Sequence, residues 1–259
     1  MRIETAYVNS LEQFVVKVRE FRESWEEEEL WFRGVKSSRH QLRPSLYRKP
    51  RTVEEAKARR KEDEARIEFS RRGQALVLER EPKSDLDWYI LMRHNNVPTR
   101  LLDWSEASLV ALYFALRTDS SNHPHDKQMN AAVWILDPQW LNERAIGKPE
   151  LLTTSSSVVE KYLPRPRARK QRNLPPIAIL PSYLIRQMLM QRSVFTIQGA
   201  PDGFDAIGSS RGQKCLARIV VRHAGFDEIV ADLASCGVSE ATVFPNLGGV
   251  GREVTEFFL

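Results

Sequence analysis

Apolar residues recur along this 259-residue chain at two different periods. Over 10–30 they return at helical spacing behind Ser10, a residue type that caps helices. The same spacing, read with its flanking cap and breaker residues, predicts seven more helices, over 53–80, 87–95, about 104–117, 153–163, 182–191, 226–237 and 247–259.

Short apolar runs rich in β-branched and aromatic residues predict strands. They cover 30–33, 131–138, 177–180, 193–198, 215–222 and 241–245. Strands scattered among helices, without regular βαβ alternation, are typical of an α+β fold. We therefore expect one domain over 1–259, with a central mixed or antiparallel sheet flanked by helices, and a loop over 118–130.

Polar side chains gather just before the most apolar helix predicted, within "RHNNVPTRLLDWSEASLVALYFALR" at 93–117. The cluster consists of His94, Thr99, Arg100, Asp103 and Trp104. Polar groups beside a core need either a protein partner or a ligand. The cluster is therefore a candidate site.

Asp103 also has structural interpretations. With Glu106 three residues later it fits a capping box for the helix that follows. Alternatively it forms a buried ion pair with Arg100. Neither interpretation accounts for Thr99 and Trp104 beside it, so a site remains an equal alternative.

Arg33 stands in "LWFRG", on a predicted strand and next to Gly34. A guanidinium is a rigid fork for phosphate, and glycine permits close approach of a ligand to the backbone. Pairing of Arg33 with the acidic run 26–29 is the structural alternative.

Composition narrows the class of protein without identifying it. The chain is 42% hydrophobic and 28% charged, which is typical of a globular domain. No apolar segment reaches the roughly 18 residues that a membrane span needs, and the N-terminus lacks an apolar secretory core. Cys215 and Cys236 form neither a disulfide framework nor a metal-ligand spacing, so we expect a reducing cytoplasm and no metal.

The modest net charge of +5 is distributed unevenly. The proline-flanked segment 165–172 contains Arg165, Arg167, Arg169, Lys170 and Arg172. The predicted helix 53–80 adds Arg59, Arg60, Lys61, Arg71 and Arg72. Such runs can contact nucleic acid, although a charge run alone is more often a solvated surface.

Common catalytic motifs are missing from the sequence. There is no P-loop, no G-x-S-x-G and no H-E-x-x-H, and "GGVG" at 248–251 is expected to be a turn. His123 and His125 with Asp126 are a weak metal candidate within a polar loop.

Six blocks, in order, resemble the FRG domain family, which is named for its Phe-Arg-Gly motif. They are "WFRG", "LRPSLYR", "RHNNVPTRLLDWSEASLVALYFAL", "AAVWILDP", "QRSVFTIQG" and "VFPNLGG", spanning about 32–251. The family signature has the form His-x-Gly-x-Pro-Thr-Arg-Leu-Leu-Asp-Trp. Asn96 replaces its glycine here, and asparagine also tolerates a left-handed backbone.

The resemblance implies a bacterial setting in toxin–antitoxin or phage-defence systems, with an antitoxin or defence protein as partner. The block order is also similar to ADP-ribosyltransferases of the Arg-Ser-Glu type, which use NAD. By that similarity Arg33 would hold the phosphates and ribose, and His94 a ribose hydroxyl. Thr99, Asp103 and Ser105 would compete to shape the nicotinamide pocket beside Trp104, with Arg100 and Gly34 also at the cofactor.

The transferase similarity lacks its third element, a late-strand glutamate. No glutamate occurs between Glu160 and Glu228. Gln191 is the nearest positional substitute, and Asp103 could instead supply the carboxylate. Two hypotheses therefore stay open: an ADP-ribosyltransferase or NAD glycohydrolase, and a nucleic-acid-binding or nuclease-like toxin without NAD chemistry.

Both hypotheses carry expectations about placement. Arg33 and the 99–104 segment should line one pocket, because both are polar islands at the ends of apolar elements. As an exposed binding residue, Arg33 should contribute little to stability.

Overall fold

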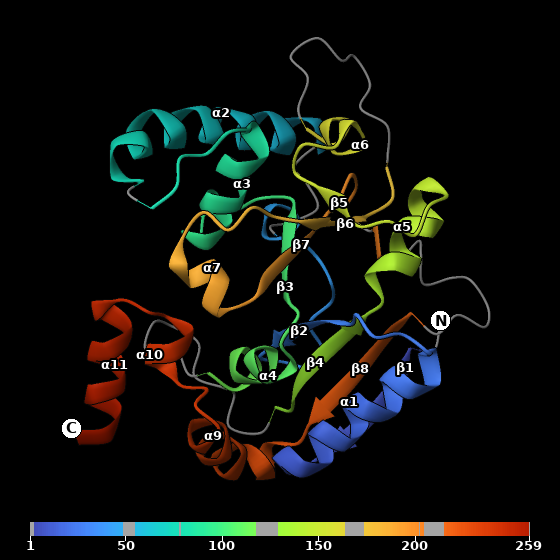
Figure 1. The fold of residues 1–259 in the computed structure, drawn as a ribbon, viewed down its shortest axis with the longest axis vertical. Helices are drawn as coiled ribbons and strands as arrows, with labels where there is room; N and C mark the ends of the chain where they lie inside the picture. Colours follow the sequence, from blue (N-terminus) through green and yellow to red (C-terminus); the bar gives the residue numbers. More distant parts are fainter. Residues whose placement is uncertain are drawn as a thin grey trace.

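One mixed sheet of eight strands organises the molecule (Figure 1). The computed structural model describes residues 3–48, 55–77, 79–117, 129–163, 174–201, 203–204 and 215–258. The strands are β1 Glu4–Val8, β2 Trp31–Val35, β3 Leu101–Ser105, β4 Ala131–Leu136, β5 Leu152–Thr153, β6 Ile177–Leu180, β7 Ser193–Ile197 and β8 Leu216–Val221. The expected α+β class, with a mixed sheet between helices, is confirmed.

The strand order is β1-β8-β4-β2-β3-β7-β6-β5, with parallel pairing at both edges and antiparallel pairing between them. The central junction is the weakest, since β2 and β3 pair only at Phe32 and Ser105. Each of these strands pairs over five positions with its outer neighbour, β4 or β7. The two halves of the sheet therefore diverge at β2 and β3 (Figure 1).

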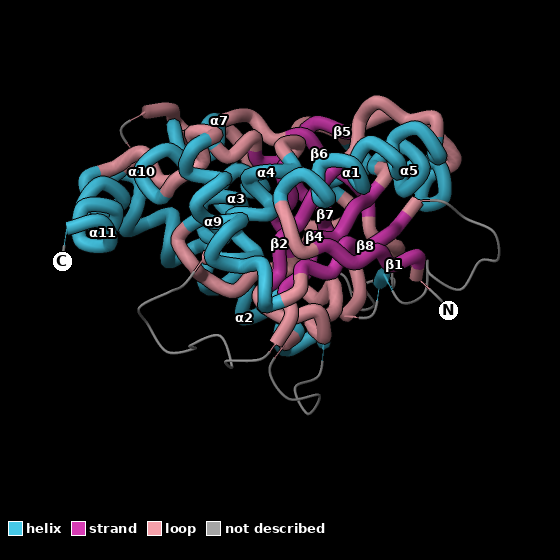
Figure 2. Tube along the Cα trace, turned by 90° about the horizontal axis from the view of Figure 1, so that it is seen from below, coloured by secondary structure: helices cyan, strands magenta, loops and turns pink. Residues whose placement is uncertain are grey.

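Helices cover both halves of the sheet. They are α1 Leu11–Trp25, α2 Glu55–Gly73, α3 Asp85–His94, α4 Ser108–Leu116, α5 Pro138–Ile146, α6 Ser157–Glu160, α7 Arg186–Met190, α9 Phe226–Ser235, α10 Glu240–Val243 and α11 Leu247–Phe258. Short 3₁₀ turns lie at Ser45–Tyr47, Gln74–Leu76 and His223–Gly225. Figure 2 shows α1 and α4 lying along one side of the strands.

Three apolar clusters form the core. The first packs α1, α4 and α9 against one face of β2, β4 and β8, through side chains such as Phe14, Leu112 and Ile229. The second covers the opposite face and includes Trp31 and Trp134. The third packs α3 and α6 against β3, β6 and β7. The second cluster extends across both halves of the sheet, since it also contains Trp104 of β3 and Val194 of β7.

The segment after Arg100 differs from the expected single helix over 104–117. Residues 101–105 form β3, and α4 begins only at Ser108. Asp103 pairs with Phe195 of β7 in the middle of a ladder, and the N-cap of α4 is Ala107, with no side-chain cap. The capping-box interpretation of Asp103 is therefore wrong, because pairing with β7 extends the chain past Trp104.

Three smaller expectations also change. The predicted strand 241–245 is instead α10 over its first residues, where Ser239 and Thr242 form a reciprocal capping box. "GGVG" is the first part of α11 rather than a turn. Strand β1 was not predicted, because only Val8 of its residues is buried. Asn96 has φ of 60°, the left-handed conformation expected of it.

Among the described residues, no helix combines the length and the apolar character needed to cross a membrane. Neither cysteine is in a disulfide; Cys215 is buried and Cys236 is exposed.

Candidate functional site

A cavity of about 990 Å³ opens where β2 and β3 separate. Its walls come from β2, the 36–48 segment, the end of α3, β3, α4, the start of β7, and the C-terminal α10–α11 region. Eight of its lining residues are arginine or lysine: Arg33, Lys36, Arg39, Arg43, Arg48, Arg93, Arg117 and Arg252. Asp103 is the one carboxylate among the described lining residues. The cavity is therefore strongly cationic.

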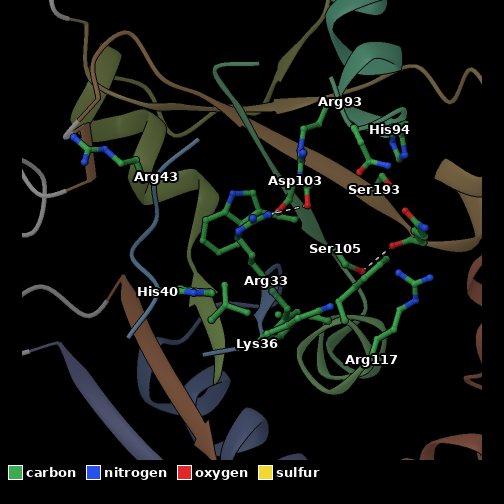
Figure 3. Close-up of a pocket in the computed structure, with 18 of the residues that line it drawn as sticks. Arg33, Lys36, His40, Arg43, Arg93, His94, Asp103, Ser105, Arg117 and Ser193 are labelled. Carbon is green, nitrogen blue, oxygen red and sulfur yellow. Dashed lines mark hydrogen bonds and ion pairs between the residues drawn. The ribbon is translucent and has the colours of Figure 1, made fainter. Parts of the chain in front are cut away.

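Arg33 and Asp103 meet at the centre of this cavity (Figure 3). The Nη1 of Arg33 donates to the Oδ2 of Asp103 at 2.8 Å and to its backbone oxygen at 2.5 Å. Arg93, from the last turn of α3, donates its Nε–H to the other carboxylate oxygen of Asp103. One carboxylate thus orients two guanidiniums.

This geometry corrects three sequence-based interpretations. Arg33 pairs with Asp103, not with the acidic run 26–29. Asp103 pairs with Arg33 and Arg93, not with Arg100. The side chain of Arg33 is only 8% exposed, so it is not the exposed residue that the sequence suggested.

The arginines set the ionisation state of Asp103. Burial alone would raise the pKa of Asp103, but Arg33 and Arg93 outweigh burial and hold that pKa well below its usual range. Arg48 lies close to the same group: burial lowers its pKa to about 10, and repulsion from Arg33 and Arg93 acts in the same direction. Three guanidiniums around one carboxylate leave uncompensated positive charge, which an anionic ligand would stabilise.

His94 closes the cavity beside Asp103. Its ring packs edge-on against Phe195, with centroids 5.8 Å apart. Burial lowers the pKa of His94 to about 4, and Arg93 acts in the same direction, so the ring is neutral at pH 7. Within the described part of the chain, its buried Nε2 has no hydrogen-bond partner. An unsatisfied polar atom at a cavity wall is a natural contact for a ligand hydroxyl.

The end of β3 brings Ser105 and Gln191 together. The hydroxyl of Ser105 donates to the backbone oxygen of Gln191 at 2.8 Å, and the side-chain amide of Gln191 donates to the oxygen of Val243. Trp104 also lines the cavity, but it is only 3% exposed and donates its Nε1–H to Thr196. These residues shape the wall, and Trp104 is chiefly a core residue.

Glycine is needed at position 34 because α4 packs against it. The sequence had suggested instead that a ligand approaches the backbone there. A Cβ on Gly34 would lie 1.9 Å from the oxygen of Ala111 and 2.6 Å from the backbone nitrogen of Ala115. The backbone that approaches Gly34 so closely is therefore that of α4. The motif glycine lets α4 lie against β2 directly beside Arg33, although Gly34 also borders the cavity.

Thr99 and Arg100 lie away from the cavity. Arg100 is buried and donates to Glu62 of α2, with Nε 2.6 Å from Oε2, and to the oxygen of Tyr162. Thr99 is fully buried and its hydroxyl accepts from Leu101. The expected shared pocket thus includes Asp103 and Trp104 but not Thr99 and Arg100, which precede β3 and whose side chains are buried away from the cavity.

The cations suggested for nucleic-acid binding on α2 are largely neutralised. Arg59 is buried and donates to the oxygen of Gly199. Arg60 pairs with Glu64, and both Arg71 and Arg72 pair with Glu68. The basic segment 165–172 and the residues His123, His125 and Asp126 lie outside the described residues. The described residues hold no group of three or more potential metal ligands.

The far wall of the cavity was not predicted from the sequence. Glu240 of α10 is 8% exposed and accepts hydrogen bonds from Tyr113, Arg117 and Arg252. Burial would raise the pKa of Glu240, but these donors lower it to about 2. Both arginines lie over the Phe244 ring, at 4.4 and 5.6 Å from its centroid. Nothing local in the sequence couples Arg117 to residues more than 120 positions later.

Arg48 and Arg93 were also missed as site residues. Both stand beside motif residues, Arg48 closing "LRPSLYR" and Arg93 preceding His94. The signal that could have identified them is the excess of arginine over acidic residues within the motif blocks themselves.

Residues 28–124 match the family model described as the FRG domain. The match contains Arg33, His94 and Asp103, and it ends before the later blocks that also resembled the family. No curated protein and no solved structure matches the chain.

Proposed function

We propose that this protein is an ADP-ribosyltransferase-like enzyme that binds NAD, because residues 28–124 match the FRG domain model and the motif residues Arg33, His94 and Asp103 meet in one cationic cavity. The observation that carries the proposal is the convergence of Arg33 and Arg93 on Asp103, with Arg48 lining the same cavity. A pyrophosphate is the part of NAD that such a group of guanidiniums suits, since phosphate accepts charge-assisted bonds from arginine forks.

The size and lining of the cavity also support a dinucleotide. Ligand pockets typically range from about 300 to 1,000 Å³, so a cavity of about 990 Å³ stands at the upper end. The unsatisfied Nε2 of His94 is available to a ribose hydroxyl. Ser105 and Gln191 border the same wall and would limit where the nicotinamide ring can lie.

In the proposed reaction, the bond between nicotinamide and C1′ of its ribose breaks, and the bonding electrons leave with nicotinamide, which departs neutral. Once the phosphates of NAD bind Arg33 and Arg48, the ionised Asp103 stabilises the positive charge that develops on the ribose. A nucleophile then forms the new bond to C1′, and its proton passes to solvent. Water as nucleophile gives NAD glycohydrolysis, and a macromolecular acceptor gives ADP-ribosylation.

The resemblance to the FRG family also motivates a biological setting. We propose that the protein acts as a toxin or defence effector in a bacterial cytoplasm and that an antitoxin or defence-system protein controls it. The alternative, a nucleic-acid-binding or nuclease-like toxin without NAD chemistry, predicts nucleic-acid cleavage or binding that is indifferent to NAD.

Incubation of the purified protein with NAD labelled in its adenylate half tests the proposal. The expected result is release of free nicotinamide together with label on water-derived ADP-ribose or on a macromolecule from added cell extract. Asp103→Asn should lose this activity, whereas Glu106→Gln, at a nearby carboxylate outside the cavity lining, should retain it. Intact NAD after prolonged incubation at high enzyme concentration would refute the proposal.

A further inference from the structure

The C-terminal helix α11 presents its apolar side chains to solvent. Leu247, Val250, Val254 and Phe258 recur at intervals of three and four residues, so they lie on one face of the helix. Their relative exposures are 91%, 46%, 49% and 80%. We call these four side chains the apolar stripe. In an ordinary surface helix such a stripe faces the core, so α11 is turned the opposite way.

The polar side of α11 attaches the helix to the rest of the molecule. Arg252 donates to the carboxylate of Glu240 in α10, and the carboxylate of Glu253 accepts the backbone N–H of Ala241 at 2.7 Å. Among the described residues of α11, only Gly249 is buried. Figures 1 and 2 both show α11 at the edge of the molecule. These contacts direct the apolar stripe away from the body, where another molecule can reach it.

The apolar stripe suits an identical copy of the same helix. A two-fold contact requires a surface that is complementary to itself. If two α11 helices lie antiparallel, with Leu247 of each level with Phe258 of the other, then Val254 is level with Gly251 of the other copy. A Cβ on Gly251 would meet nothing within 4 Å, so the open space there can receive the valine. The antiparallel arrangement also places the positive end of each helix dipole beside the negative end of the other.

The charges of α11 favour a second copy over a membrane surface. Helices that lie on membranes carry lysine and arginine on their polar face. In α11 the one arginine, Arg252, pairs with Glu240, and two glutamates, Glu253 and Glu256, accompany it. The stripe itself is uncharged, so two copies can meet there without like-charge repulsion.

We propose that α11 is a dimerisation helix, whose apolar stripe packs antiparallel against the same stripe of a second copy of this chain. One face of a 12-residue helix is smaller than the roughly 800 Å² per partner of a standard interface, so the dimer dissociates on dilution. Each α11 also carries Arg252, which lines the cavity, so dimerisation supports one wall of each cavity. The contact does not depend on NAD chemistry.

Sedimentation equilibrium over a range of protein concentrations tests the surface. We expect a monomer–dimer equilibrium for the wild type. Val250→Glu combined with Val254→Glu should raise the dissociation constant by about tenfold or more, because it places unpaired charges in the contact. Val15→Glu combined with Ile67→Glu adds the same charge at side chains that are 50% and 53% exposed on α1 and α2, and should dimerise as the wild type does. A wild type that stays monomeric throughout, or equal weakening in the two variants, overturns the proposal.

Disulfide formation between two single variants tests the orientation and does not require a destabilised helix. Both variants carry Cys236→Ser, which removes the exposed thiol. When mixed, Gly251→Cys and Val254→Cys should cross-link with each other far more than either does with itself. Preferential cross-linking of each variant with itself indicates parallel helices and overturns the antiparallel pair. A monomeric protein that binds anionic phospholipid vesicles through Val250 and Val254 assigns the stripe to a membrane and overturns dimerisation.

Discussion

Asp103 accepts hydrogen bonds from Arg33 and Arg93, so removing its charge leaves two guanidiniums close together in a partly buried position. Asp103→Asn should therefore lower the free energy of unfolding by about 2 to 3 kcal/mol, less than for a fully buried pair because Asp103 is 39% exposed. Urea denaturation measures this change.

Glu106→Gln is the matched control for Asp103→Asn. Glu106 pairs at 3.4 Å with Arg192, which is 61% exposed, so its loss should cost under about 1 kcal/mol. Equal stability of Asp103→Asn and wild type would show that the two arginines do not depend on this carboxylate. The capping hypothesis, by contrast, predicts a nearly neutral Asp103→Asn.

His94 makes stability depend on pH. Burial lowers the pKa of His94 to about 4, whereas an unfolded histidine titrates near about 6.5. As pH falls through this window the unfolded chain binds a proton that the native state does not, so the native state loses stability. His94→Gln should remove this loss, which amounts to about 3 kcal/mol at pH 4.

The free energy of unfolding of the wild type and of His94→Gln, measured from pH 7.5 to pH 4, tests this prediction. Asp137 acts in the opposite direction, since burial raises its pKa to about 6, and the two slopes partly cancel in the wild type. The difference between the two profiles isolates His94. Parallel profiles would mean that His94 titrates as it does in water.

At the scale of elements, the contact between β2 and α4 depends on Gly34. A methyl group there would overlap the α4 backbone at Ala111, so Gly34→Ala should destabilise the protein by about 3 kcal/mol or more. Gly251→Ala is the control: it lies within α11 with open space around it, and alanine there should stabilise by about 0.5 to 1 kcal/mol. Thermal melting distinguishes them, and a soluble Gly34→Ala with unchanged melting temperature would contradict the packing account.

Helices and strands could be predicted from the sequence where the apolar pattern was long and regular. The strands near 131–136, 177–180, 193–197 and 216–221 and the helices α1 and α9 lie where apolar periodicity predicted them. Two of the errors share a cause: β3 and β1 pair with strands that are distant in the sequence. Asp103, for example, pairs with Phe195, which lies 92 positions later in the chain. The sequence around 104–117 therefore contains no sign of this pairing.

For the molecule as a whole, the site was only partly predictable. Arg33, His94, Asp103, Ser105 and Gln191 were anticipated and do line one cavity. Arg93 and Arg100 stand in the same polar block of the sequence. Arg100 nevertheless pairs with Glu62, whereas Arg93 pairs with Asp103. Arg93 lies in the last turn of α3 and Arg100 lies just before β3, and the direction of each side chain cannot be read from a polar cluster. The contribution of Glu240, Arg117 and Arg252 required the tertiary fold.

The central claim is that the cavity between β2 and β3 binds NAD through Arg33. Isothermal titration of NAD into the wild type and into Arg33→Lys tests it most directly, because lysine keeps a positive charge beside Asp103 but lacks the rigid fork. We expect one site per chain in the wild type and at least tenfold weaker binding in a variant that remains folded. Absence of NAD binding to the wild type, or equal affinity in both proteins, would contradict the claim.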